Sequence, residues 1–161
     1  LARAPKQPAA AYAYERKALP YGGAPCDGGC RPSYLIIGIG KCGTSSLYYY
    51  LTAHPMVVQA RRKQIQFFDH AYDASRISSR YLSQLPSSLK AGEVTGEASP
   101  GYAQYSQVPG RVARHLHGVR ILVIARDPAE RAHSSYHYKK HKLQLLLLLL
   151  LLLLLLLLLN Y

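Results

Sequence analysis

The 161-residue chain is long enough for one folded domain, and its 20 lysines and arginines against 8 acidic residues give a net charge of +12 at pH 7. This excess favours anionic partners such as nucleotides, nucleic acids, acidic or sulfated glycans, or membrane surfaces. Three cysteines do not make a disulfide framework, although Cys26 and Cys30 are close enough for a local disulfide; as a zinc half-site they would need a second such pair, which the sequence lacks.

The first 33 residues predict a linker or stem ahead of the folded part. Residues 1–33 are rich in Ala, Pro, Gly and Tyr and show no steady apolar period. The chain begins with Leu rather than Met, which indicates a fragment. We expect the folded part, a partial domain, to occupy residues 34–142.

The segment YLIIGIGKCGTSSLYYYL, residues 34–51, predicts a strand, a glycine turn and a helix. Its opening apolar run with β-branched residues is typical of a strand buried on both faces of a sheet. Leu47 and Leu51 lie four residues apart, on one face of the helix that follows. That helix should end before Pro55, because the residue preceding a proline disfavours helical conformation.

Shorter elements follow in the middle of the chain. Residues 56–59, MVVQ, and residues 93–97 predict two more strands, and residues 74–82 predict a short helix. The segment VPGRVARHLHG predicts another helix, because its apolar residues share one helical face. Those residues are Val108, Val112 and Leu116, with Gly118 as the C-terminal stop.

Residues 119–141 repeat the order of the first unit. The segment VRILVIA, residues 119–125, is a nearly continuous apolar strand. Asp127 is placed to cap the next helix, Pro128 fits its first position, and Glu130 completes a capping box. Two such units with a helix between them predict an α/β fold, a parallel sheet flanked by helices on both faces. Ligands of such sheets bind at the carboxyl ends of the strands, where both turns lie.

The C-terminal part is dominated by fifteen consecutive leucines, residues 145–159. A membrane-spanning helix needs about 20 apolar residues, with about 17 as the lower limit, so this run is short. A homopolymer also lacks the side-chain pattern that would fix one packing partner. We therefore interpret residues 143–161 as a low-complexity tail, with a membrane anchor as the alternative.

The centre of the first turn, GIGKCG, matches the dinucleotide fingerprint G-x-G-x-x-G. That fingerprint expects an acidic residue about 20 positions later for the ribose hydroxyl, and this chain has Arg61, Arg62 and Lys63 there. An ATP-binding P-loop places its lysine after the last glycine, whereas Lys41 precedes Gly43. An NADP- or ATP-binding α/β enzyme is therefore disfavoured and stays open as an alternative.

Two anion sites are indicated instead, one at each strand–helix junction. Lys41, the hydroxyls of residues 44–46 and backbone N–H groups at the helix start can meet one anionic group, and Thr44 can also cap the helix. In the second unit, Arg126 follows the strand and Ser134 lies in the second turn of the helix. The sequence therefore predicts a ligand that carries phosphate at two places.

At these residues the chain resembles a known family. GIGKCGTSSLYYYLTAHP is similar to the 5′-phosphosulfate loop of sulfotransferases that use 3′-phosphoadenosine 5′-phosphosulfate (PAPS), and RDPAERAHSSY is similar to their 3′-phosphate motif. The order of the motifs and the intervening QFFD and GEASPGY most resemble the Golgi carbohydrate sulfotransferases of the heparan sulfate and chondroitin type. The resemblance covers residues 34–141 and implies a P-loop-like nucleotide-binding sulfotransferase fold, truncated here at its C-terminus.

The resemblance implies in-line transfer of a sulfuryl group from PAPS, the co-substrate, to a hydroxyl or amine of an anionic glycan, without a metal. Lys41 would contact the 5′-phosphosulfate and stabilise charge on the bridging oxygen. A membrane-anchored protein of the Golgi lumen, with no nucleic-acid partner, is also implied. The residues that would bind the donor are Lys41, Cys42, Gly43, Thr44, Ser45, Ser46, Arg126 and Ser134.

The catalytic base is the point at which this chain departs from the family pattern. There a segment resembling K-E-x-x-F-F supplies a glutamate, and the matching stretch KQIQFFD has Gln64 in its place. An amide cannot usefully accept a proton near neutral pH. Asp69, His70 and Glu97 are the candidates for this role, and an inactive fragment is the alternative.

A binding module without catalysis is the second alternative function. Arg61, Arg62, Lys63 and the basic run at residues 139–142 could serve a glycan or a nucleic acid. Proteins that bind single-stranded nucleic acid combine such charge with aromatic side chains on which bases stack. The tyrosines of this chain cluster elsewhere, which argues against nucleic acid.

Overall fold

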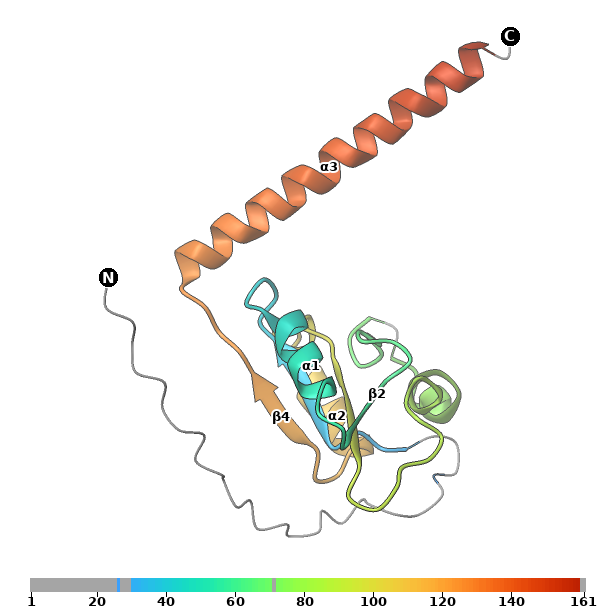
Figure 1. Cartoon of the computed structure of the whole chain (residues 1–161), viewed down its shortest axis with the longest axis vertical. Coiled ribbons are helices and arrows are strands. Elements are labelled where there is room, and N and C mark those ends of the chain that lie inside the picture. Colours follow the sequence, from blue (N-terminus) through green and yellow to red (C-terminus); the bar gives the residue numbers. More distant parts are fainter. Residues whose placement is uncertain (1–25, 27–29, 71, 160–161) are drawn as a thin grey trace.

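A computed structural model of the chain describes Cys26, residues 30–70 and residues 72–159. These residues form an α/β domain from which one long helix projects (Figure 1). Short 3₁₀ and π-helical turns cover residues 74–84 and Tyr102–Gln104. The strands are β1 (Tyr34–Gly38), β2 (Val57–Gln59), β3 (Val94–Ala98) and β4 (Arg120–Val123), and the α-helices are α1 (Thr44–Thr52), α2 (Val108–His115) and α3 (Pro128–Leu159).

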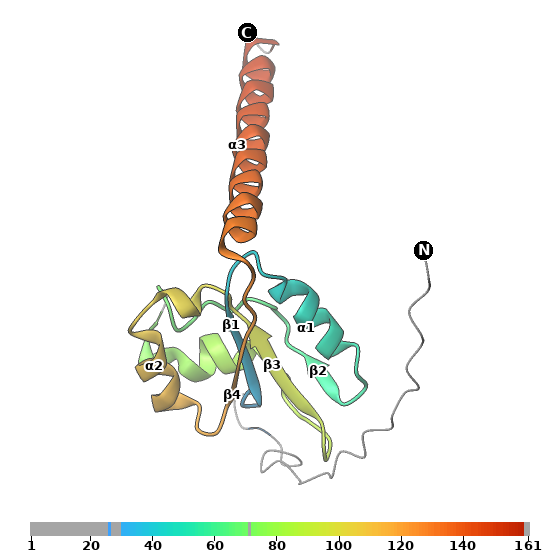
Figure 2. The same cartoon turned by 90° about the vertical axis from the view of Figure 1, so that its left-hand side faces the viewer.

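The four strands form one parallel sheet in the order β2-β3-β1-β4. The central strand is β1, in which Leu35 is in register with Glu97 of β3 and with Ile121 of β4. Because all strands run in the same direction, the loops that follow them emerge at one edge of the sheet, and α3 rises from that edge (Figure 2). The parallel sheet predicted from the sequence is confirmed.

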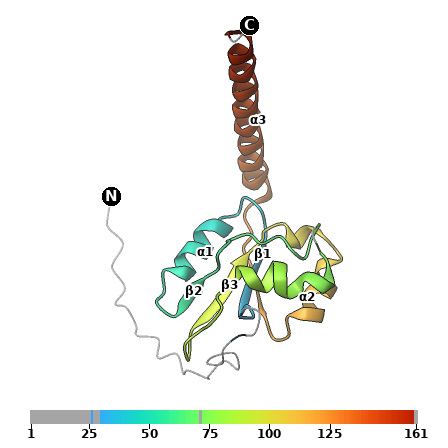
Figure 3. The ribbon, with the colours of Figure 1, turned by 90° about the vertical axis from the view of Figure 1, so that its right-hand side faces the viewer.

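Alternate side chains of β1 enter two separate hydrophobic cores. Leu35 packs in one core with α2 and the turns at residues 74–84, whereas Ile36 packs in the other with Tyr48 of α1. Helices therefore cover both faces of the sheet, as predicted (Figure 3). Burial on both faces also explains why β1 is apolar at nearly every position.

The helix expected at residues 74–82 is present only as short turns. A 3₁₀ turn, a π-helical turn and a second 3₁₀ turn follow one another over residues 74–84. Tyr81 is fully buried against Phe68, with their ring centroids 4.8 Å apart. The aromatic contact, rather than a continuous helical ladder, holds this segment on the sheet.

The last strand differs from the apolar strand expected at residues 119–125. It is shorter, Arg120–Val123, and it lies at the edge of the sheet, where β1 is its only strand partner among the described residues. Ile121 and Val123 consequently expose 46% and 59% of their surface. Apolar character along β4 therefore did not indicate burial.

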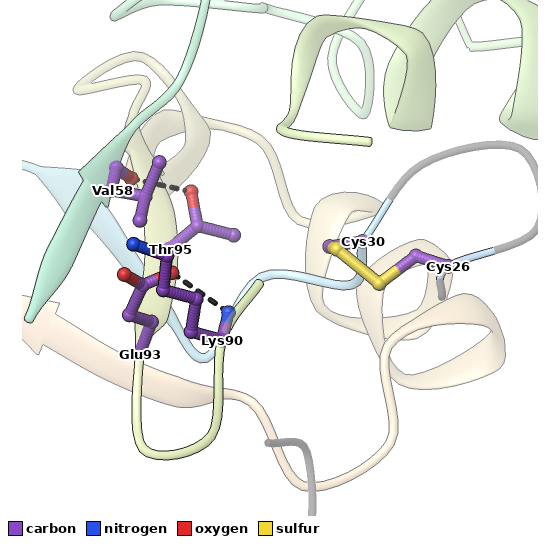
Figure 4. Close-up of a disulfide and its surroundings, with 6 residues drawn as sticks. All are labelled: Cys26, Cys30, Val58, Lys90, Glu93 and Thr95. Atoms are coloured by element: carbon purple, nitrogen blue, oxygen red, sulfur yellow. Dashed lines mark hydrogen bonds between the residues drawn. A yellow bond between two sulfur atoms is a disulfide. The ribbon is translucent and has the colours of Figure 1, made fainter. Parts of the chain in front are cut away.

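A disulfide joins Cys26 to Cys30 ahead of β1, as the spacing allowed (Figure 4). Cys30 is buried, and its N–H donates to the carbonyl oxygen of Pro86 at 2.8 Å. The N–H of Ser33 donates to the carbonyl oxygen of Thr95 at 2.7 Å, so residues 30–33 are already held against the sheet. The remainder of the predicted linker, apart from Cys26, lies outside the described residues.

Helix α3 continues without interruption from the domain through the leucines to Leu159. Its start confirms the predicted cap, because Asp127 Oδ1 accepts hydrogen bonds from the N–H groups of Ala129 and Glu130 at 2.9 and 3.0 Å. The predicted capping box is wrong, since the Glu130 carboxylate pairs with Arg126 instead. By length and composition alone, Pro128–Leu157 could cross a membrane.

Candidate active site

The loop between β1 and α1 forms a tight turn at the end of the central strand. Lys41 and Gly43 both adopt positive φ angles, +69° and +88°. Gly43 precedes α1 without a side-chain cap, and Thr44 is the first helical residue, so the interpretation of Thr44 as the cap is wrong. The N–H groups in the first turn of α1 therefore keep their capacity to bind an anion.

Two hydrogen bonds join this loop to the segment after β4. The N–H of Ile39 donates to the carbonyl oxygen of Ile124 at 2.8 Å. The N–H of Ile124 donates to the carbonyl oxygen of Gly38 at 3.0 Å. They extend the pairing of β1 with β4 beyond the ends of both strands. Arg126 and the first turns of α3 are thereby placed beside the β1–α1 loop.

One cavity of about 560 Å³ is lined by both of these loops. Lys41 and Arg126, the two cations of the predicted anion sites, both lie on its wall, together with Ser134 of α3. The structure thus brings the two predicted anion sites into a single cavity at the carboxyl ends of adjacent strands. Its lining residues are Gly40, Lys41, Gly43, Thr44, Ser45, Gln64, Gln66, Pro100, Gly101, Arg126, Ser134 and Tyr138.

Two of the residues expected to bind the donor do not line this cavity. Cys42 is buried, and its thiol donates to a backbone carbonyl of the same turn, so its small side chain supports the loop. Ser46 is exposed on α1. Conversely, the sequence interpretation missed Gln66 and Tyr138. The signal for Tyr138 is its spacing of four residues from Ser134, which places both on one face of a helix.

The two cations of the cavity have different local partners. Lys41 Nζ lies 4.1 Å from the centroid of the Tyr138 ring, a cation–π contact. Arg126 Nε donates to Glu130 Oε2 at 2.8 Å. The side chains of this pair are 44% and 62% exposed, so water screens their attraction. A phosphate group can therefore displace Glu130 from Arg126 readily.

A third cation supports the β1–α1 loop from the segment after β2. Lys63 Nζ donates a hydrogen bond to Ser45 Oγ, and partial burial lowers the pKa of Lys63. The carbonyl oxygen of Lys63 accepts the N–H of Ala98 at 2.8 Å. Lys63 thus connects the end of β3 to the first turn of α1 and fixes the backbone immediately before Gln64.

The cavity wall carries Gln64, and the three candidates for the catalytic base lie elsewhere. Asp69 is buried, and its Oδ1 accepts the N–H of His70 at 2.7 Å, while the His70 ring is hydrogen-bonded to Tyr105 Oη at 2.6 Å. Glu97 is buried beneath the wall. Within the described part of the chain, the wall therefore has no carboxylate or imidazole. Residues 26, 30–70 and 72–159 also contain no group of three His, Cys, Asp or Glu side chains that could hold a metal ion.

Glu97 is fully buried near the end of β3, where it binds the segment that follows Gln64. Its Oε2 accepts hydrogen bonds from the N–H of Ile65 at 3.2 Å and from Ser99 Oγ at 2.6 Å. Burial raises the pKa of Glu97 to about 7. Hydrogen bonds from the Ser99 hydroxyl and the N–H of Ile65 favour the charged form and offset part of this rise in pKa.

Two further side chains continue this support of the cavity wall. Ser99 Oγ accepts the N–H of Gln66 at 3.0 Å, and Tyr102 Oη accepts the N–H of Phe67 at 2.9 Å. Together with the bond from Ile65 to Glu97, the backbone N–H groups of residues 65–67 are thus all bound by side chains from β3 and the turn after it. This support fixes the backbone that carries Gln64 and Gln66 to the cavity. The partners are 32 to 35 positions apart, so no local pattern could reveal them.

Curated proteins are similar in sequence to about two thirds of this chain. No family model matches the chain. The membrane-associated sulfotransferase kil1 of Dictyostelium discoideum is 33% identical over 111 residues, 68% of this chain and 23% of that protein. The heparan sulfate glucosamine 3-O-sulfotransferase 5 of Mus musculus is 35% identical over 105 residues, 65% of this chain and 30% of that protein. The chain belongs to the sulfotransferase family.

The fold of this sulfotransferase chain agrees with the assignment. A solved sulfotransferase from Alicyclobacillus acidocaldarius superimposes with a TM-score of 0.54 and 27% sequence identity, over 70% of this chain and 51% of that one. The sulfotransferase fold implied by the resemblance is therefore confirmed. The chain spans 23% and 30% of the lengths of the two curated relatives named here.

Proposed function

We propose that the chain binds PAPS in the cavity between the β1–α1 loop and α3 and transfers the sulfuryl group to a hydroxyl or amine of an anionic glycan. The observation that carries this proposal is that Lys41 and Arg126 line one cavity. Two cations at the ends of adjacent strands suit a ligand with two separate anionic groups. The heparan sulfate enzymes among the relatives support a glycan acceptor, and the net charge of +12 suits an anionic one.

In this proposal the two loops divide the donor between them. Lys41, Thr44 and Ser45, with the N–H groups in the first turn of α1, bind the 5′-phosphosulfate end. Arg126 and Ser134 bind the 3′-phosphate by charge-assisted and neutral hydrogen bonds. The whole set lies on the wall of one cavity, which supports a single nucleotide rather than two separate anions.

Catalysis then depends on positioning and electrostatics, as it does in phosphoryl transfer. Lys41 stabilises the negative charge that develops on the bridging oxygen as the bond from sulfur to that oxygen breaks. Its ammonium group supplies the counter-charge, so the proposed step uses no metal ion. Gln64 hydrogen-bonds the acceptor group but does not remove its proton, so that proton passes to water as the new bond to sulfur forms and adenosine 3′,5′-bisphosphate departs with the electron pair of the broken bond.

We assign residues 34–142 to a partial sulfotransferase domain and place the protein at the Golgi membrane. The resemblance to Golgi carbohydrate sulfotransferases supports this location. So does the relation to kil1, which is named as membrane-associated, and the presence of one helix that is long and apolar enough to cross a bilayer.

Thermal unfolding with adenosine 3′,5′-bisphosphate, NADP and Mg–ATP in parallel tests donor binding. The bisphosphate alone should raise the Tm, without added metal, because it carries both anionic groups of the donor. Lys41→Met and Arg126→Met should each weaken bisphosphate binding about 10- to 100-fold, since each removes hydrogen bonds to a charged group. Arg114→Met, an exposed arginine of α2 away from the cavity, is the matched control.

Two results would contradict the assignment. Selective stabilisation by NADP would favour a dinucleotide enzyme, and no response to any nucleotide would favour a binding module. Transfer itself is measured with radiolabelled PAPS and heparan sulfate, against a control without acceptor.

A further inference from the structure

We propose that the leucine half of α3 spans a lipid bilayer and thereby holds the nucleotide cavity at the membrane surface. Leu143 and the leucines at positions 145–157 each expose between 48% and 67% of their surface. Successive helical residues are about 100° apart, so leucine covers every side of the helix instead of one stripe. A protein partner would need only one apolar face, whereas hydrocarbon surrounds a helix on all sides.

The length of the apolar segment fits a bilayer of modest thickness. At about 1.5 Å per residue, residues 143–159 extend about 25 Å along the helix axis. Hydrocarbon cores are about 30 Å thick on average and about 27 Å in the endoplasmic reticulum. The helix runs unbroken through this segment, so its backbone polar groups are satisfied internally, as hydrocarbon requires. The one polar residue, Gln144, stands at the domain end of the segment.

Basic residues lie directly before the apolar segment. Lys139, Lys140 and Lys142 are exposed on the turn of α3 that precedes Leu143. Lysines at such a boundary extend their ammonium groups into the headgroup layer and are attracted by anionic lipids. The basic turn therefore marks the level at which the helix would enter the bilayer.

The anchor and the cavity share one helix, which fixes the distance between them. Tyr138 lines the cavity and contacts Lys41, and it precedes Leu143 by five residues, or about 7.5 Å along the axis. The headgroup layer is about 5–8 Å thick on each side of the hydrocarbon. The cavity consequently lies at the level of the headgroups. This conclusion rests on the proposed function: the acceptors that reach the cavity are glycans carried on membrane-resident molecules.

The chain contains no tryptophan, so a single tryptophan can report the depth of the helix in lipid. Leu151→Trp places it at the midpoint of residues 143–159. Tyr136→Trp places it at an exposed position of α3 before the lysines, outside the lining of the nucleotide cavity. Each full-length variant is reconstituted into phosphatidylcholine vesicles whose acyl chains carry bromine at known depths.

We expect the emission of Leu151→Trp to shift to the blue and to be quenched most by bromine near the bilayer centre. Tyr136→Trp should stay accessible to iodide in the aqueous phase. Iodide quenching of Leu151→Trp would overturn the proposal. Shielding from iodide without any bromolipid quenching would also overturn it, because that result means self-association of the leucine helices.

The same variants, held in detergent, are tested for bisphosphate binding by thermal shift. If the variants bind the bisphosphate but show no bromolipid quenching, only the membrane anchor is refuted and the proposed function stands. Bromolipid quenching without bisphosphate binding supports the anchor and refutes the proposed function alone.

Discussion

Arg126 Nε lies 2.8 Å from Glu130 Oε2, so an arginine on the cavity wall already has an anionic partner one helical turn away. A phosphate group that bonds to Arg126 Nε must displace that carboxylate, and one that bonds to the other guanidinium N–H groups meets its negative charge nearby. Exposed ion pairs of this kind contribute about 0.2–1 kcal/mol. Glu130 therefore competes weakly with any anionic ligand of the cavity.

Replacing Glu130 should tighten nucleotide binding. Glu130→Gln removes the competing charge and should raise the affinity for adenosine 3′,5′-bisphosphate by up to about five-fold. Isothermal titration calorimetry at low ionic strength measures the change. Glu93→Gln removes one carboxylate far from the cavity, where Glu93 accepts the N–H of Lys90, and should leave the affinity unchanged. Equal affinities of the wild type and Glu130→Gln would show that no competition exists.

Restoring an acid at position 64 should increase turnover. Gln64→Glu places a carboxylate on the cavity wall, where a general base typically contributes about 10²–10⁴-fold to the rate. Transfer of radiolabelled sulfate to heparan sulfate, in the presence of saturating PAPS, measures this gain.

Gln64→Met is the control for this prediction, because it has a similar length and cannot accept a proton. It should not exceed the wild-type rate. If Gln64→Glu also leaves transfer unchanged while bisphosphate still binds, the base is supplied from elsewhere and position 64 does not limit the reaction.

A methyl group at position 96 should separate the two central strands. A Cβ at Gly96 would lie 2.4 Å from the carbonyl oxygen of Tyr34 and 2.7 Å from its ring, closer than real Cβ contacts. Gly96→Ala should therefore lower the free energy of unfolding by about 1–3 kcal/mol. Urea unfolding, followed by circular dichroism, measures the loss.

Gly110 offers the matched control for the same substitution. It lies in α2, and a Cβ there would meet no atom within 4 Å. Because alanine has the higher helix propensity, Gly110→Ala should raise stability by up to about 1 kcal/mol. If both substitutions change the free energy of unfolding by a similar amount, the close packing of β3 on β1 does not explain the glycine at position 96.

Glu97 should make stability depend on pH. Its pKa is about 7 in the folded chain against an ordinary value of 4.5. Between these values the folded state binds a proton that the unfolded state has lost, so the free energy of unfolding falls as pH rises and levels off above about 7. The expected loss is on the order of 3 kcal/mol.

Glu97→Gln tests this dependence directly. Its neutral amide oxygen can still accept the N–H of Ile65, so the variant should lose the pH slope and exceed the wild type in stability at pH 8. Urea unfolding of both proteins at pH 5 and pH 8, in the same detergent, measures the difference. Parallel profiles for the two proteins would assign the pH dependence to other groups.

Local patterns allowed much of the fold to be predicted. The strand–turn–helix units follow from apolar runs and turn residues that act over a few positions, as the Asp127 cap shows. The meeting of Lys41 and Arg126 was also predictable, because parallel strands place their carboxyl ends at one edge. Here a local pattern and a general rule of topology were enough.

Other features depend on choices that no local pattern decides. The Glu130 carboxylate could bond either the N–H of Asp127, as in a capping box, or the side chain of Arg126. In the structure it bonds Arg126. The support of Gln66 by Ser99 joins residues 33 positions apart. The burial of Glu97 also could not be predicted, because burial depends on the complete fold.

The bonded pair of loops after β1 and β4 has a consequence for how this family can diverge. Neighbouring strands lie about 4.8 Å apart, and the bonds of Ile124 to Gly38 and Ile39 carry that spacing up to the cations. The backbone therefore sets the spacing of the two loops that carry these cations. If the chain acts as proposed, a donor with differently spaced charges would need a rearranged sheet, whereas side chains that contact the acceptor could change by single substitutions. Under the proposed function, proteins related to this chain should differ in their acceptors and share one donor.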